Sequence, residues 1–95
     1  MPAYLIADIK ITDPATFDEY RKLVPPLIAA HGGRYLARGG ASEVLEGAWK
    51  PNRTVVLEFP TMAALRAFWT SPEYQPLREM RERSSTSSMI AVEGI

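Results

Sequence analysis

The first apolar segment of the chain, residues 4–11, alternates between two faces and is rich in the bulky and β-branched side chains of strands. One face is apolar throughout and carries Leu5, Ala7, Ile9 and Ile11. The other face begins apolar at Tyr4 and Ile6 and becomes charged at Asp8 and Lys10. The pattern predicts a strand that gives one full face to a core and keeps a second, partly apolar face.

A helix is predicted next, because apolar residues then recur in steps of three and four. Asp13 can cap its free N–H groups, and Pro14 suits the first helical position. The stripe on one face consists of Phe17, Tyr20, Val24, Leu27, Ile28 and His31. Pro25 and Pro26 each remove a backbone donor, so a kink or a restart is expected there. The glycine pair at residues 32–33 ends the helix.

Two further strands are predicted in the middle of the chain. Residues 34–38 form the first, and residues 43–46 are expected to extend it or pair with it. Residues 47–52 contain Gly, Pro and Asn and are expected to form a loop. Residues 53–59 alternate again, and their more apolar face carries Val55, Leu57 and Phe59.

Two helical segments and a strand are predicted in the last third of the chain. The first helix has the buried stripe Met62, Leu65, Phe68 and Trp69. Ser71 is expected to cap the second helix, in which Arg78 and Glu82 are spaced as an i,i+4 ion pair. Residues 84–88 are expected to be a polar connector, and residues 89–92 the final strand.

This order of elements predicts one α+β domain over residues 1–95, a ferredoxin-like βαββαβ sandwich. Its four-stranded antiparallel sheet has helices on one face, and its first and third strands are expected to be central. Ile6 and Val56 make the opposite face apolar as well. An open apolar face on so small a domain predicts a homodimer that pairs face to face.

Composition narrows the classes of partner. Eleven basic residues balance eleven acidic ones, and this zero net charge argues against nucleic acid. With one histidine and no cysteine, the chain lacks the usual ligands of a zinc site, so neither metal nor cofactor is expected. No basic leader is present and no apolar run approaches the roughly 20 residues of a membrane span, so a soluble cytoplasmic protein without a membrane partner is expected.

Several motifs carry a resemblance to a known family. They are HGGRYLARGG at residues 31–40, VLEG at 44–47, RTVVLEFP at 53–60 and SPEY at 71–74. Together they resemble the uncharacterised bacterial family called domain of unknown function 1330, over essentially the whole chain. The resemblance implies the dimeric α/β-barrel superfamily, in which two ferredoxin-like protomers pack their sheets to close a barrel. That superfamily includes cofactor-free monooxygenases, haem-handling enzymes, muconolactone-isomerase-like proteins and stress-response modules, so it implies a fold without choosing an activity.

Three polar residues are candidates for catalysis. His31 is suited to moving a proton, and its alternative role is to cap the helix C-terminus. Arg38 is suited to holding an anionic oxygen with its donor fork, and its alternative role is an ion pair with Glu46 or Glu58. Glu58 is either a general base or the partner of an arginine such as Arg38 or Arg78.

Aromatic residues and one further arginine are candidates for ligand binding between the helices and the sheet. They are Tyr35, Trp69, Tyr74 and Arg78. The alternative for the aromatic rings is ordinary core packing. Tyr74 follows Ser71 and Pro72 closely, and Arg78 lies one helical turn beyond it on the same face.

Two classes of function therefore remain open. The first is a cofactor-free enzyme that acts on a small oxygen-bearing metabolite by proton transfer, as a monooxygenase or isomerase does. The second is a non-catalytic small-ligand-binding or stress-related dimer module. Haem binding through His31 is a third and weaker alternative.

Overall fold

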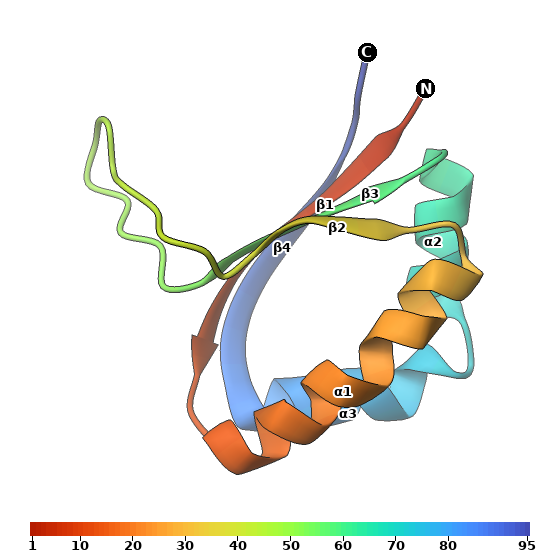
Figure 1. The fold of residues 1–95 in the computed structure, drawn as a ribbon, viewed down its shortest axis with the longest axis horizontal. Coiled ribbons are helices and arrows are strands. Elements are labelled where there is room, and N and C mark those ends of the chain that lie inside the picture. The colour runs from red at the N-terminus through yellow and green to blue at the C-terminus, as the bar shows by residue number, and fades with distance from the viewer.

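Four antiparallel strands form one sheet, and three helices cover one of its faces (Figure 1). The computed structural model describes residues 1–95. In chain order the elements are β1 (Ala3–Ile11), α1 (Pro14–Ala30), β2 (Arg34–Arg38), β3 (Thr54–Phe59), α2 (Met62–Thr70), α3 (Tyr74–Ser84) and β4 (Ser85–Glu93). The strand order is β2-β3-β1-β4, so the first and third strands are central and the predicted α+β ferredoxin-like fold is confirmed.

The core lies between the sheet and the helices, and strict alternation along the central strands builds it. The buried face of β1 and β3 consists of Ala3, Leu5, Ala7, Ile9, Val55, Leu57 and Phe59. The helices contribute Phe17, Tyr20, Val24, Ile28, Leu65, Phe68 and Tyr74. None of the three helices combines the length and apolar character that a membrane span requires.

The first helix differs from its prediction, because α1 runs unbroken through Pro25 and Pro26. The two prolines leave the carbonyls of Arg21 and Lys22 without their i+4 donors. Both of those residues are exposed, so water can satisfy the carbonyls, and burial of the apolar stripe holds the two halves of the helix on the sheet.

The cap of α1 is as predicted. The Thr16 backbone N–H and hydroxyl donate to the two carboxylate oxygens of Asp13, at 3.3 and 2.7 Å. These hydrogen bonds, the side-chain one first, hold the pKa of Asp13 below its ordinary value. The charged carboxylate therefore satisfies N–H groups that the first turn of the helix leaves free.

The last strand is longer than predicted, since the serine segment belongs to it. Strand β4 begins at Ser85 directly after α3, and it pairs with β1 from Ser85 opposite Ile11 to Glu93 opposite Ala3. The prediction was wrong because it relied on the polar side chains of these residues. Backbone N–H and C=O groups pair the two strands, and β1 has such groups free along its whole length.

Two local predictions are also wrong. Residues 43–46 form no strand; they lie in the exposed stretch 39–50 of the long connection between β2 and β3, which extends away from the sheet (Figure 1). Ser71 does not cap α3, because its hydroxyl donates to the Phe68 carbonyl at 2.9 Å and so closes α2. Residue Glu73 precedes α3 and makes no capping side-chain bond.

The chain reverses between α1 and β2 at two glycines. One is required by the backbone conformation and the other by the lack of space for a side chain. Gly32 has a φ of 78°, in the left-handed region that side chains disfavour. Gly33 lies against the core, where an added Cβ would approach Phe59 to 2.7 Å and Ile28 to 2.8 Å. By contrast, a Cβ on Gly40 would meet nothing within 4 Å.

We expect Gly33→Ala to lower the free energy of unfolding by about 1–3 kcal/mol, the usual cost of overpacking a core. Gly40→Ala is the matched control and should change it by less than about 0.5 kcal/mol. Urea unfolding of both variants measures the difference. Equal stabilities would show that β3 and α1 can separate at this point without cost.

Candidate functional site

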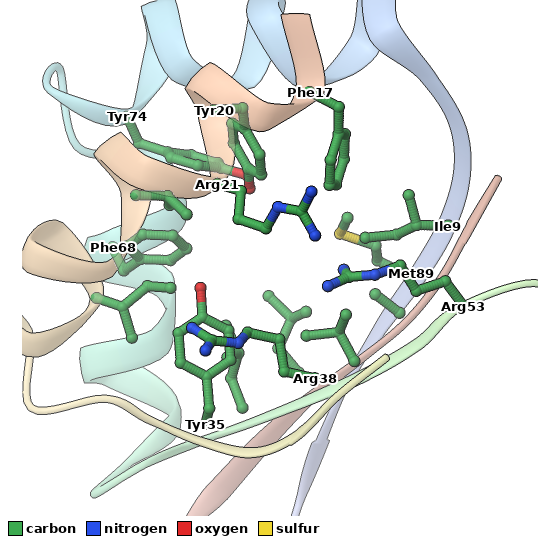
Figure 2. A pocket seen from close by; sticks show the side chains of 16 residues that line it. Ile9, Phe17, Tyr20, Arg21, Tyr35, Arg38, Arg53, Phe68, Tyr74 and Met89 are labelled. Atoms are coloured by element: carbon green, nitrogen blue, oxygen red, sulfur yellow. The ribbon is translucent and has the colours of Figure 1, made fainter. Parts of the chain in front are cut away.

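A cavity opens between the covered face of the sheet and α1 (Figure 2). Sixteen residues line it, and thirteen of them are hydrophobic. The space between these side chains is about 510 Å³, including its open mouth, and only a small part of it is enclosed. The cavity is therefore apolar and narrow, and a ligand larger than a few water molecules would have to extend into its mouth.

The three remaining lining residues are all arginines. Arg21 comes from α1, Arg38 from the end of β2, and Arg53 immediately precedes β3. Their side chains extend toward the cavity from different elements (Figure 2). The guanidinium of Arg38 lies 4.9 Å from the ring centre of Tyr35, and that of Arg53 lies 5.7 Å from the ring centre of Phe17.

Acidic groups do not balance this positive charge. Arg21 forms an ion pair with Asp18, whereas Arg38 and Arg53 have no carboxylate within ion-pairing distance. Burial, and then the charges of Arg21 and Arg38, lower the pKa of Arg53. Repulsion of Arg53 by Arg21 and Arg38 is thus the smaller part of this shift, and a bound anion would relieve it.

Tyrosine hydroxyls supply the other polar groups of the cavity. The hydroxyl oxygens of Tyr20 and Tyr74 lie 3.1 Å apart, and both residues are buried. Burial, followed by the neighbouring Tyr74, raises the pKa of Tyr20 far above its ordinary value. Burial also raises the pKa of Tyr35, against the opposing effect of Arg38. Tyr20 and Tyr35 are therefore neutral hydrogen-bonding groups at physiological pH.

Three of the predicted site residues meet at this cavity: Tyr35, Arg38 and Tyr74. His31 lies outside it. The His31 Nδ1 lies 3.1 Å from the carbonyl oxygen of Leu27, to which it donates, and its ring meets Phe68 edge-on at 6.0 Å. The structure thus gives His31 the contacts of its alternative role, closing the C-terminus of α1.

The other three predicted residues also lie away from the cavity. Glu58 faces the opposite side of the sheet and accepts a hydrogen bond from Arg34 Nε at 2.8 Å. It therefore pairs with an arginine, as one alternative expected, but the partner is Arg34 and not Arg38 or Arg78. Arg78 lies over the Trp69 ring at 4.6 Å. Its Nε donates to Glu82 at 2.8 Å, which confirms the i,i+4 pair.

Sequence reasoning missed Arg21, Arg53 and Tyr20 as site residues. A signal for Arg53 was present, because it continues the two-residue period of Val55 and Leu57 toward the covered face. Tyr20 belonged to the predicted apolar stripe and was assigned to the core alone. No three side chains of His, Cys, Asp or Glu come together in the fold, so the chain offers no clustered set of metal ligands.

We expect His31→Ala to lower the free energy of unfolding by about 1 kcal/mol, because it removes the bond to Leu27 and the contact with Phe68. The NMR shifts of the Tyr35 ring, which lines the cavity, should stay unchanged. Urea unfolding and aromatic spectra measure the two effects. Unchanged stability together with shifted Tyr35 signals would contradict the helix-closing role.

Solved structures of similar fold come from several bacteria. A protein of unknown function from Rhodopseudomonas palustris has a TM-score of 0.79 at 16% identity, covering 99% of this chain and 82% of that one. SnoaB, a cofactor-independent oxygenase from Streptomyces nogalater, has a TM-score of 0.68 at 14% identity, covering 99% and 93%. A dimeric ferredoxin-like protein of unknown function from Jannaschia sp. CCS1 has a TM-score of 0.66 at 15% identity, covering 99% and 100%.

These similarities establish the fold, and at such low identity they carry no activity with them. No curated protein has a sequence that matches this chain. The family model described as "Domain of unknown function (DUF1330)" matches residues 2–95, nearly the whole chain. The resemblance seen in the motifs is thereby confirmed, and the chain belongs to the DUF1330 family.

Proposed function

We propose that the protein binds a small organic anion with an apolar body in the cavity between α1 and the sheet. One observation carries the proposal: three arginines converge on an apolar cavity, and two of them, Arg38 and Arg53, have no carboxylate partner. An anionic group at the mouth would receive charge-assisted hydrogen bonds from these planar donors. The apolar body would displace water from the hydrophobic walls.

The same arrangement of arginines is also compatible with an enzyme. Arginines beside a desolvated substrate stabilise an enolate or phenolate oxygen and so favour loss of a proton from an oxygen-bearing metabolite. The cavity holds no His, Asp or Glu, so the proton would leave through the mouth to solvent. The fold similarity to SnoaB, named a cofactor-independent oxygenase, agrees with such chemistry. A ligand-binding module without turnover is the alternative.

Within this proposal, Arg38 holds the anionic oxygen, and Tyr35 and Tyr74 line the binding space. His31 and Glu58, first considered as catalytic groups, take structural roles, because each has its contacts outside the cavity. Oxygen consumption and proton release during incubation with enolisable acids would separate turnover from binding alone.

We expect the arginines to select for charge. The protein should bind 4-isopropylbenzoate more tightly than neutral 4-isopropylbenzamide, which has the same shape. Arg38→Met and Arg53→Met should each weaken benzoate binding about tenfold, as the loss of a charge-assisted hydrogen bond does. Isothermal titration calorimetry measures the affinities.

Arg83→Met is the matched control, since Arg83 is exposed on α3 and does not line the cavity. It should leave both affinities unchanged. Equal binding of the acid and the amide, or an equal loss in all three arginine variants, would contradict a specific anion site.

We also propose that the protein is a homodimer formed through the open face of the sheet. Strand register places Val56, Ile6 and Ile90 side by side across three strands on this face. Ile90 is 62% exposed, and its neighbour Val92 is 43% exposed. A second copy would bury this apolar row, and the Jannaschia protein of similar fold is described as dimeric.

We expect Ile90→Glu to convert the dimer to a monomer, because pairing would place two charges inside an apolar interface. Native mass spectrometry measures the change. Leu23→Glu is the matched control, since Leu23 is 51% exposed but lies on α1, and it should remain dimeric. A monomeric unmodified protein would contradict the proposal.

A further inference from the structure

A buried arginine behind the cavity has no acidic partner. Arg81 on α3 is only 4% exposed, and no carboxylate lies within ion-pairing distance of it. Its Nη1 donates to the Ser87 hydroxyl at 2.5 Å, and its Nε donates to the Tyr74 hydroxyl at 3.3 Å. A charged group is rarely buried without a counter-charge, so this arrangement calls for an explanation.

The contact between Arg81 and Tyr74 gives a direction to the hydrogen bonds beyond it. A guanidinium can only donate, so the Tyr74 oxygen accepts from Arg81. Accepting a bond from a cation makes the Tyr74 O–H a stronger donor and its oxygen a poorer acceptor. Its one other side-chain partner is the Tyr20 oxygen at 3.1 Å. The direction in which Tyr74 donates to Tyr20 is therefore the favoured one.

The Tyr20 O–H is left at the end of this sequence of bonds. No second side-chain or backbone partner binds the Tyr20 hydroxyl, and Tyr20 lines the cavity together with Tyr74. Its proton is thus a donor for which the protein supplies no acceptor. The contacts run from Arg81 through Tyr74 to Tyr20, which lies in the wall of the cavity.

We propose that Arg81 orients the Tyr74–Tyr20 pair so that the Tyr20 O–H donates to a second oxygen of the bound ligand. This inference rests on the proposed function and refines it. The ligand class is then a carboxylic acid that also carries a carbonyl group. Its anionic group would meet the arginines, and its carbonyl or similar acceptor oxygen would meet Tyr20. Arg81 does not line the cavity, so it is a positioning residue.

The environment of the pair agrees with a donor role. Burial raises the pKa of Tyr20, so this hydroxyl keeps its proton and does not act as a base. Through the two hydroxyls, the charge of Arg81 also favours negative charge that develops on the second ligand oxygen. A carbonyl held in this way would be polarised toward its enolate form.

Two matched pairs of acids test the inference. In each pair one member carries a carbonyl and the other an alkyl group of similar shape: 4-oxopentanoate with 4-methylpentanoate, and 4-acetylbenzoate with 4-isopropylbenzoate. The preference is the ratio of the affinity for the carbonyl acid to the affinity for its alkyl counterpart. For at least one pair, this ratio should be about 3- to 10-fold greater in the unmodified protein than in Tyr20→Phe. That range corresponds to the loss of one hydrogen bond. Calorimetric titration measures the four affinities.

Variants further along the chain of bonds test the positioning role. Arg81→Met should reduce the carbonyl preference and leave the affinity for the alkyl acids nearly unchanged, whereas Arg83→Met should alter neither. If Arg81→Met fails to fold, Tyr74→Phe provides the same test. It keeps the ring packing but removes the hydroxyl that links Arg81 to Tyr20. A preference that survives in Tyr20→Phe, or in both upstream variants, would overturn the inference.

The two proposals fail in different ways. If binding of the alkyl acids requires Arg38 and Arg53 but no carbonyl preference exists, the anion site is supported and the hydrogen-bond donor role of Tyr20 is contradicted. If none of the four acids binds more tightly than its neutral amide, the anion site is contradicted. The donor role of Tyr20, which rests on that site, is then contradicted as well.

Discussion

The alternation of β1 at the centre of the sheet is the constraint on which the rest of the structure depends. Successive side chains of a strand point to opposite faces, so one strand serves two surfaces. Leu5, Ala7 and Ile9 form part of the core and of the cavity wall, while Ile6 lies in the apolar row of the open face. A shift of register by one residue would exchange the two surfaces and destroy both.

The polar groups of the site depend on that apolar framework. Arg21, Arg38 and Arg53 come from a helix, a strand end and a loop end, and the packed sheet and helix bring them around the mouth of one apolar cavity. Arg21 and Arg38 are exposed and Arg53 is partly buried, so their attraction for an anion would strengthen as a ligand displaces water from the mouth. The buried pair of Tyr20 and Tyr74 adds two hydroxyl groups to the same space.

Much of the fold could be predicted from the sequence, because it rests on periodic patterns. The faces of β1 and β3 and the stripe of α1 followed from spacings of two and of three to four residues. The errors arose where backbone or tertiary contacts outweighed local preference. Burial of the apolar stripe carries α1 through Pro25 and Pro26, and pairing with β1 draws the serines after Ser84 into a strand.

The candidate site was predictable only in part. Tyr35, Arg38 and Tyr74 belong to it, but the sequence could not show that His31 and Glu58 point elsewhere. Periodicity determines which face of its own element a side chain occupies, and that information is local. Whether residues from separate elements converge depends on helix packing and strand order, which are set by contacts between distant parts of the chain. The sequence by itself thus determined the layers, and the tertiary structure decided which charges meet.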